Sequence, residues 1–257
     1  AEEIRGDEYS HGLAPILNNN SHKLTGILNG IDYKYYDPAN DKEIYQNFGS
    51  GELDKKVKNK TELQKALGLP VREDVPLVAI ISRLASHKGL DLIREVAYGL
   101  VDNNDMQLVV LGKGEAQYEN FFVDLERNRN DKVRALMMYD RDLSKRIYAA
   151  CDIFLMPSKS EPCGLAQMIS CSYGTVPIVR SVGGLYDSII PYGAEGSNGF
   201  RFDNYNAYDL LYSIKSAVSL YRDKKEWAKL VVAAKKSDFT WKNSAAKYIK
   251  IYNKLTQ

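Results

Sequence analysis

Cysteine is scarce in this 257-residue chain, which contains only Cys151, Cys163 and Cys171. The three cysteines form no C-x-x-C pair and have no histidine close by in the sequence, which argues against a disulfide framework and against a zinc site. A small, odd number of cysteines is typical of proteins from a reducing compartment. We therefore expect a cytoplasmic location.

Long apolar runs and an excess of charge are also missing. No run approaches the ~18 apolar residues of a transmembrane helix, and the polar start, Ala1-Glu2-Glu3-Ile4-Arg5, does not resemble a signal peptide. Lys and Arg number 35 against 33 Asp and Glu, for a formal net charge of +2, which argues against a dedicated nucleic-acid-binding module. We expect neither a membrane nor a nucleic acid as partner.

The chain does contain an alternation of apolar segments with two different periods. Short continuous apolar runs predict strands that are buried on both faces, and the segments between them have helical spacing. This alternation indicates right-handed crossovers and an α/β fold with a doubly wound, mostly parallel, Rossmann-like sheet. We predict strands at residues 77–81, 106–111, 133–138, 153–156 and 176–179, with helices near 93–101, 118–126, 143–150 and 165–171.

The remaining segments define the expected domain organisation. Residues 1–43 are polar, rich in Asn, Tyr and Gly, and end in a turn-like sequence, so we interpret them as an approach segment. Residues 44–257 are interpreted as one Rossmann-like domain, which includes the helices that close the chain after Phe202.

The loops that follow the strands are where a doubly wound sheet binds ligands. The first of these loops, residues 82–89, holds Arg83 and Lys88 directly after the most apolar strand. A guanidinium and an ammonium at this position suit the two phosphates of a diphosphate, although two solvated loop charges give the same pattern. Gly112-Lys113-Gly114 lacks the third glycine of a dinucleotide fingerprint, and we interpret it as a tight strand-to-helix turn.

Residues 157–167 form the most informative loop, with Glu161 and Gly164 ahead of the next expected helix. If that helix begins near Gly164, its first N–H groups and the positive end of its dipole favour an anion in the cleft. A carboxylate repels phosphate, so Glu161 suits a neutral, hydroxyl-rich group beside the phosphate, such as a sugar; an exposed turn residue is the alternative. A nucleophilic role for Cys163 is disfavoured because no histidine base is near it in the sequence.

Together these segments resemble the donor-binding half of the bacterial glycogen synthase and plant starch synthase family. Members of this family are retaining glycosyltransferases built from two Rossmann-like domains, the GT-B type. The resemblance runs from about residue 24 to the C-terminus. Its motifs are, in order, Gly26 to Asp32, Ser82 to Gly89, Glu161 to Leu165, Arg180 to Leu185 and Phe239-Thr240-Trp241.

The resemblance implies three catalytic residues. Arg83 and Lys88 would bind the diphosphate and stabilise the charge that develops on the leaving nucleoside diphosphate. Glu161 would accept hydrogen bonds from the hydroxyls of the transferred glucose. Because protein cations meet the phosphates, the resemblance implies no divalent metal and no cofactor.

It also implies how the rest of the donor is held. The backbone of Gly164, Leu165 and Ala166 would hold the distal phosphate, Cys163 would line the sugar pocket, and Tyr139 would stack on the base. Ile169 stands eight residues after Glu161, where many related transferases have a second Glu that holds the ribose. The synthase subfamily commonly lacks that Glu, so the ribose-binding residue stays unassigned.

The family's N-terminal domain begins with a Lys-containing Gly-Gly-Leu loop and supplies the acceptor groove, and no such loop precedes residue 24 here. The resemblance implies that the approach segment is a remnant of that domain, with residues 1–23 as its tail. We therefore expect the donor-binding half of a glycogen synthase, inactive by itself and completed by an N-terminal domain. The intact enzyme of this family transfers glucose from ADP-glucose to the non-reducing end of an α-1,4-glucan with retention.

Two alternatives remain open at this point. The chain is a related transferase that uses UDP-glucose or a small acceptor, or it is a non-catalytic module that binds a nucleotide or a glucan. The 18 tyrosines would suit sugar stacking, but they are scattered along the chain, and packing explains most of them.

Overall fold

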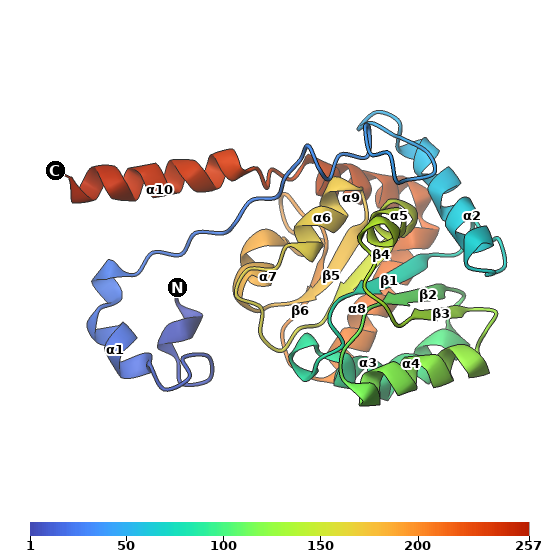
Figure 1. Cartoon of the computed structure of the whole chain (residues 1–257), viewed down its shortest axis with the longest axis horizontal. Coiled ribbons are helices and arrows are strands. Elements are labelled where there is room, and N and C mark those ends of the chain that lie inside the picture. Colours follow the sequence, from blue (N-terminus) through green and yellow to red (C-terminus); the bar gives the residue numbers. More distant parts are fainter. Residues whose placement is uncertain (257) are drawn as a thin grey trace. The chain divides into compact units, whose positions relative to one another are not determined.

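A parallel sheet organises the computed structural model of this chain, which describes residues 1–256 (Figure 1). The strand order is β3-β2-β1-β4-β5-β6, and every neighbouring pair is parallel. The order changes direction between β1 and β4, so the carboxyl ends of these two strands form the switch point at which doubly wound sheets bind ligands. The strands are β1 (Leu77–Ile81), β2 (Gln107–Leu111), β3 (Val133–Leu136), β4 (Ile153–Met156), β5 (Val176–Arg180) and β6 (Phe200–Phe202).

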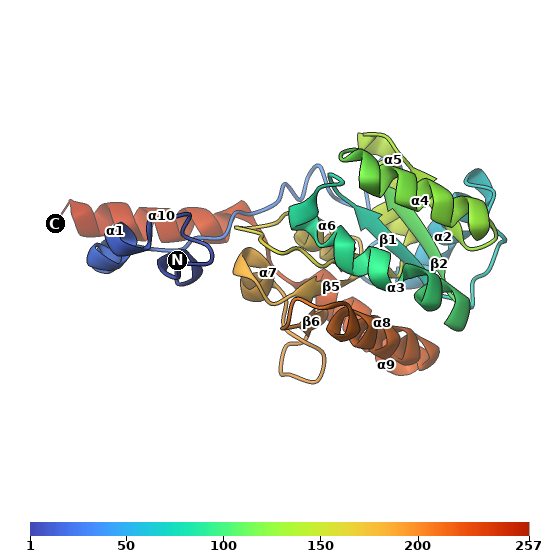
Figure 2. The same cartoon turned by 90° about the horizontal axis from the view of Figure 1, so that it is seen from below.

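Helices cover both faces of this sheet, as a doubly wound fold requires. One buried apolar cluster joins the sheet to α3, α4 and α8, whereas α2, α5 and α6 pack on the opposite face. Figure 2 shows α9 beside α8, with which it is in contact. The helices are α2 (Lys56–Ala66), α3 (Leu90–Asn103), α4 (Ala116–Asn128), α5 (Arg141–Ala150), α6 (Ala166–Ser172), α7 (Gly183–Ser188), α8 (Ala207–Arg222) and α9 (Lys224–Lys236).

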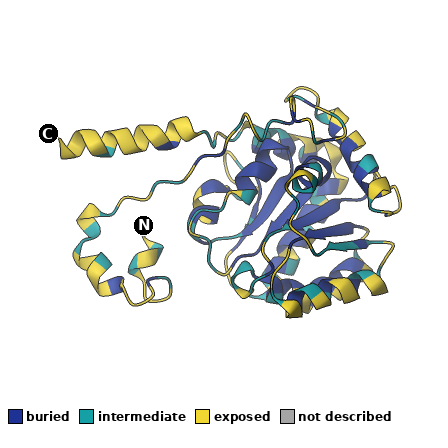
Figure 3. Ribbon diagram, in the orientation of Figure 1, coloured by how far each residue is buried: buried dark blue, intermediate teal, exposed yellow. Residues whose placement is uncertain are grey.

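The α/β fold and the five predicted strands are confirmed, with small shifts at some strand ends. β1 and β4 match the predicted residues without a shift, because each is a continuous apolar run whose side chains the two helical layers bury (Figure 3). β6 was not predicted, because a three-residue strand has no readable period. α9 lies in the segment after Phe202 that was expected to be helical, but it was not delimited as a separate helix, although its buried residues Trp227, Leu230, Val231 and Ala234 have helical spacing.

The chain divides into two compact units, Ala1–Gly30 together with Phe239–Gln257, and Ile31–Asp238. The first unit contains α1 (Ala14–Asn19) and α10 (Trp241–Leu255). Its two segments are joined where the Ser244 hydroxyl donates to the carbonyl of Leu28 at 2.6 Å. Gly30 lies so close to α10 that a Cβ there would come within 2.4 Å of the Trp241 nitrogen.

This division differs from the boundary after residue 43 that the sequence suggests. Residues 31–43 belong to the unit that contains the sheet. The physical reason is a buried anchor, in which Asp41 Oδ2 accepts a hydrogen bond from the hydroxyl of Tyr173 at 2.5 Å. A polar segment can therefore be part of the packed domain when its polar groups are satisfied inside it.

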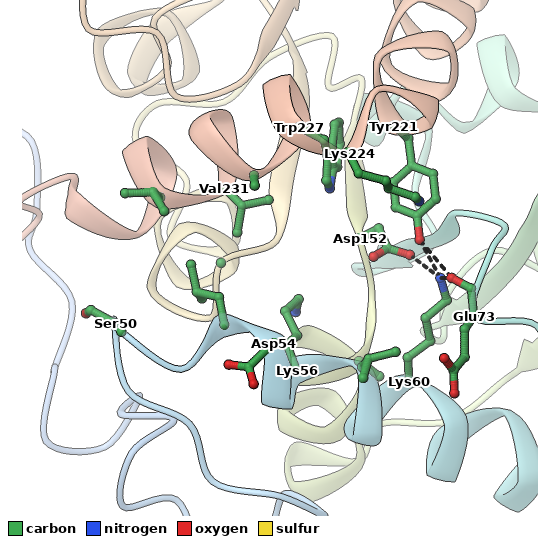
Figure 4. A pocket seen from close by; sticks show the side chains of 17 residues that line it. Ser50, Asp54, Lys56, Lys60, Glu73, Asp152, Tyr221, Lys224, Trp227 and Val231 are labelled. Atoms are coloured by element: carbon green, nitrogen blue, oxygen red, sulfur yellow. Dashed lines mark hydrogen bonds and ion pairs between the residues drawn. The ribbon is translucent and has the colours of Figure 1, made fainter.

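Two buried lysines fasten α2 to the amino-terminal edge of the sheet. Lys60 Nζ lies 2.8 Å from Asp152 Oδ2 and 2.9 Å from the hydroxyl of Tyr221 (Figure 4). Lys56 Nζ donates instead to uncharged oxygens, the carbonyl of Ala149 at 2.8 Å and the hydroxyl of Thr175 at 2.9 Å. Burial lowers the pKa of Lys56 to about 7.

The low pKa of Lys56 predicts that the protein becomes more stable as pH rises from 7 towards 10. In the unfolded chain Lys56 keeps its proton up to its ordinary pKa of 10.5, whereas in the folded protein it releases the proton near pH 7. The unfolded state then binds more protons, so the free energy of unfolding rises by up to about 1.4 kcal/mol per pH unit. Urea denaturation at several pH values measures this slope.

Lys56→Met should flatten the slope, and Lys58→Met is the matched control, because Lys58 is an exposed lysine on the same helix. The same slope in Lys56→Met and the unmodified protein would contradict the assignment.

Candidate functional site

Two adjoining clefts lie at the carboxyl ends of the strands, and Ile81, Ser82 and Arg83 line both of them. We call them the β1–β4 cleft and the β2–β3 cleft. The β1–β4 cleft is further lined by Ile80, Lys88, Leu155 to Ser158, Glu161 and Gly164 to Ala166. The β2–β3 cleft is further lined by Tyr35, Tyr36, Leu111 to Lys113, Met138 to Arg141, Ser144, Tyr148 and Ile169.

An ion pair occupies the β1–β4 cleft. Lys88 Nζ lies 2.6 Å from Glu161 Oε2, and the side chains are only 17% and 11% exposed. The buried Ser158 hydroxyl donates to the same carboxylate oxygen at 3.3 Å. Because both charges are largely shielded from water, the pair presents a fixed cation beside a fixed carboxylate, rather than two mobile surface charges.

The close approach of two loops holds this pair in place. Gly89 has a φ of +71°, and a Cβ at this position would lie 1.9 Å from the carbonyl oxygen of Pro157. Beside it, the Lys159 N–H donates to the carbonyl of His87 at 2.9 Å. Glycine is needed here for both its left-handed backbone and its lack of a side chain. The loop after β1 and the loop after β4 therefore form one packed unit.

Arg83 differs from Lys88 in its surroundings. Its side chain is exposed, and within residues 1–256 its guanidinium has no hydrogen-bond or ion-pair partner. A guanidinium at the junction of two clefts can bind two oxygens of an anion at once. The geometry therefore places an unpaired cation next to a paired one.

The loop from Glu161 to Ala166 packs on the first residues of α7. The Gly184 N–H donates to the carbonyl of Glu161 at 3.1 Å, and a Cβ on Gly184 would lie 2.1 Å from the carbonyl oxygen of Cys163. The helix that follows begins at Ala166 rather than near Gly164, because Gly164 has a left-handed φ of +70°. The N–H groups of that first turn have no partner within the helix, and the first of its residues, Ala166, lines the cleft.

Cys163 is the one predicted site residue that lines neither cleft. Its side chain is partly buried and is not part of a disulfide. The backbone of this residue instead forms the surface on which Gly184 packs. The structure thus assigns Cys163 a packing contact, and its predicted place in a sugar pocket stays a prediction.

The β2–β3 cleft is aromatic. Tyr139 stands at its rim with 84% of its surface exposed. Tyr35 and Tyr36 line the same cleft but were missed by sequence analysis, because they lie in a polar segment more than 40 residues before β1. Burial raises the pKa of Tyr36, and the Arg141 guanidinium lies 5.5 Å from the centre of the Tyr35 ring. A cleft with aromatic walls and a cation suits a flat ring attached to an anion.

This chain is similar to known proteins both in its sequence and in its structure. The family described as "Glycosyl transferases group 1" matches residues 59–237. The chain belongs to this family. Glycogen synthases of Clostridioides difficile (strain 630) and Bacillus subtilis (strain 168) are 47% and 43% identical over 255 and 257 residues, which is 98% and 99% of this chain. The chain spans about half the length of the curated relatives it matches, 53% in both cases.

The solved structures agree with this membership. The catalytic domain of starch synthase IV from Arabidopsis thaliana, bound to ADP and acarbose, has a TM-score of 0.92 and 38% identity, covering 98% of this chain and 53% of that one. Sucrose-phosphate synthase from Thermosynechococcus elongatus shares the fold, with a TM-score of 0.64 and 21% identity over 94% of this chain and 56% of that one. The chain is therefore a glycogen synthase-like domain of the group 1 glycosyltransferases.

Two sequence features of this group 1 domain have structural explanations. Gly114 packs so closely on the loop after β1 that a Cβ would lie 2.2 Å from the carbonyl oxygen of Leu84, which agrees with the interpretation of this loop as a tight turn. Ile169 lines the β2–β3 cleft and presents an apolar side chain there. Within residues 1–256, no three His, Cys, Asp or Glu side chains are grouped to hold a metal ion, and no helix has the length and apolar character to cross a membrane.

Another cavity of the glycosyltransferase domain lies elsewhere, at the amino-terminal edge of the sheet (Figure 4). Its volume is about 530 Å³, and its walls include Val57, Trp227 and Val231. Two of the charged residues that line it, Lys60 and Asp152, are paired with each other. Since ligands of doubly wound sheets bind at the opposite edge, we place the functional site in the two clefts.

The contact between Gly89 and Pro157 gives a testable prediction. Gly89→Ala should lower the free energy of unfolding by at least about 2 kcal/mol, because the new Cβ meets a carbonyl oxygen on a left-handed backbone. Gly99→Ala is the matched control: Gly99 lies in α3, and its nearest neighbour would be 3.8 Å from the new Cβ. The free energy of unfolding of this control variant should instead rise by about 0.5–1 kcal/mol, because alanine favours a helix more than glycine does. Equal stabilities of the two variants in urea denaturation would refute the packing argument.

Proposed function

We propose that this domain binds ADP-glucose and forms the donor side of a glycogen synthase. The intact enzyme would transfer glucose to the non-reducing end of an α-1,4-glucan with retention of configuration. The observation that supports this proposal most is the position of the Lys88–Glu161 pair and Arg83 at one switch point, beside an aromatic cleft. The relatives named glycogen synthase support the choice of reaction.

The two clefts divide a nucleotide sugar between them. We propose that the base stacks on Tyr139 in the β2–β3 cleft, and that Arg83, at the junction, binds the diphosphate. The distal phosphate would then lie at the backbone of Gly164, Leu165 and Ala166, with Lys88 beside it. The glucose would lie against Glu161, whose carboxylate accepts hydrogen bonds from sugar hydroxyls.

This arrangement favours departure of ADP. When the bond between the anomeric carbon and the distal phosphate oxygen breaks, negative charge grows on that phosphate. The departing phosphate oxygen takes the proton that the acceptor hydroxyl loses as the new glycosidic bond forms. Lys88 and Arg83 stabilise the growing charge more than the ground state, which lowers the barrier. We propose that these two cations take the place of a divalent metal.

The acceptor side would come from a second domain. α10 has apolar side chains on its exposed surface, at Tyr248, Ile249, Tyr252 and Leu255. Exposed apolar residues gathered on one helix indicate an interaction surface. We propose that this helix contacts an N-terminal domain of the intact enzyme, and that the enzyme works in the cytoplasm, where cysteines outside disulfides stay reduced.

The diphosphate assignment is tested by ADP binding, measured by titration calorimetry. Arg83→Ala and Lys88→Ala should each weaken ADP binding by about 1.5–3 kcal/mol, which is roughly a 10- to 150-fold rise in Kd, because each removes a charge-assisted contact. Arg127→Ala is the matched control, since Arg127 is an exposed arginine on α4. Unchanged affinity in both cleft variants would overturn the assignment.

The choice of nucleotide is tested by thermal unfolding with ADP, UDP and GDP at equal concentrations. A ligand that binds only the folded state raises the Tm in proportion to RT ln(1 + [L]/Kd), so we expect ADP to raise it most. A larger rise with UDP would favour the related transferases that use UDP-glucose.

A further inference from the structure

A third groove lies outside the donor clefts, between the edge strand β6 and the first turns of α8, two elements that pack together (Figure 2). Its volume is about 470 Å³, and none of its lining residues belongs to either donor cleft. This size is in the range of grooves that hold a small molecule or a short oligomer. We call it the β6–α8 groove.

Tyrosines line the β6–α8 groove at the protein surface. Tyr212 of α8 is 75% exposed, and Tyr192 is 44% exposed. The Tyr192 ring stacks on Phe200 of β6, with ring centres 5.5 Å apart, which limits its motion. Tyr208, also 75% exposed, precedes Tyr212 by four residues and is therefore its neighbour on the same side of α8. Rows of exposed rings of this kind offer flat apolar faces with polar rims.

The polar groups of the groove are mostly acceptors. Asp203 is exposed, and Asp209 Oδ2 accepts a hydrogen bond from Asn204 Nδ2 at 2.9 Å. Ser216 adds a hydroxyl, which donates to the carbonyl of Tyr212 at 2.9 Å. The cation of the groove, Arg201, donates to the carbonyls of Tyr186 and Ile189, at 3.0 and 3.3 Å. Its charge is thus directed at α7 and the residue after it.

These features select one kind of ligand. Two carboxylates against one guanidinium leave the groove with a net negative charge, which repels phosphates and other anions and disfavours nucleotides and nucleic acids. A protein surface, including a second copy of this chain, would need a larger continuous apolar area than this short row of tyrosine rings provides. A sugar ring has an apolar face that packs on an aromatic ring and hydroxyls that donate to carboxylates. Uncharged oligosaccharides therefore fit the groove in both respects.

We propose that the β6–α8 groove is a second carbohydrate site, which binds an α-1,4-glucan chain apart from the donor clefts. The kind of glucan rests on the proposed function, whereas the preference for an uncharged oligosaccharide rests on the groove. A polymer held at this site stays near the enzyme between transfers, because the second contact with the same molecule is effectively intramolecular. The groove thus anchors the polymer and does not react with it.

The test is affinity electrophoresis of the chain in native gels with and without glycogen, together with maltoheptaose as a soluble competitor. The unmodified chain should be retarded by glycogen and released by maltoheptaose. Tyr212→Ala should raise the apparent Kd by about tenfold, since one stacking contact is lost. Asp203→Ala is a second variant, which removes an acceptor from an exposed position and leaves the core intact.

Tyr45→Ala is the matched control, because Tyr45 is an exposed tyrosine that lines neither of the two donor clefts nor the β6–α8 groove. It should be retarded like the unmodified chain. Tyr212→Ala should also bind ADP with unchanged affinity, which separates this site from the donor clefts. Equal mobility of the unmodified chain with and without glycogen, or full retardation of both groove variants, overturns the proposal. If the unmodified chain does not bind ADP, that result would instead overturn the proposed function.

Discussion

The close contact between Gly89 and Pro157 is the constraint on which the site depends. It joins the loop after β1 to the loop after β4. These two strands are neighbours in the sheet, at the point where the strand order changes direction. With any side chain at Gly89, the two backbones would have to separate. Lys88 is the residue before this contact, and Glu161 follows Pro157 by four residues. The contact thus brings a lysine and a glutamate 73 residues apart into a 2.6 Å ion pair.

The positively charged side chains at the two edges of the sheet differ in whether they face the interior of the protein or a cleft. At the amino-terminal edge, Lys60 is paired with Asp152 and Lys56 is enclosed by uncharged oxygens, so these lysines hold helix α2 in place. At the carboxyl edge, Arg83 is exposed and the Lys88–Glu161 pair faces a cleft. Buried lysines at the first edge have satisfied hydrogen bonds, whereas the cations at the second edge retain donors for a ligand. Charge is therefore structural at one edge and available at the other.

A pre-formed pair has a consequence for ligand binding. Phosphate would compete with Glu161 for the ammonium of Lys88, and sugar hydroxyls would compete with Lys88 for the carboxylate of Glu161. A ligand that carries both groups replaces both halves of the pair together, so neither buried charge is left without a partner. A free phosphate or a free sugar replaces only one half. The proposed donor, ADP-glucose, joins a phosphate and a sugar in this way.

The sequence by itself determined strands β1 to β5, the doubly wound class and the loops that carry the candidate site. Continuous apolar runs such as Leu77–Ile81 are long enough to predict strands that are buried on both faces. The residues that follow these strands must then lie at the carboxyl edge of a parallel sheet. Tertiary structure alone decided the rest: the three-residue strand β6, the position of Tyr36 in a cleft, and the packing contact of Cys163. It also sorted the tyrosines, leaving Tyr212 exposed and Tyr173 buried. Periodicity reports local burial, whereas these features depend on contacts between segments far apart in the chain, which no local pattern encodes.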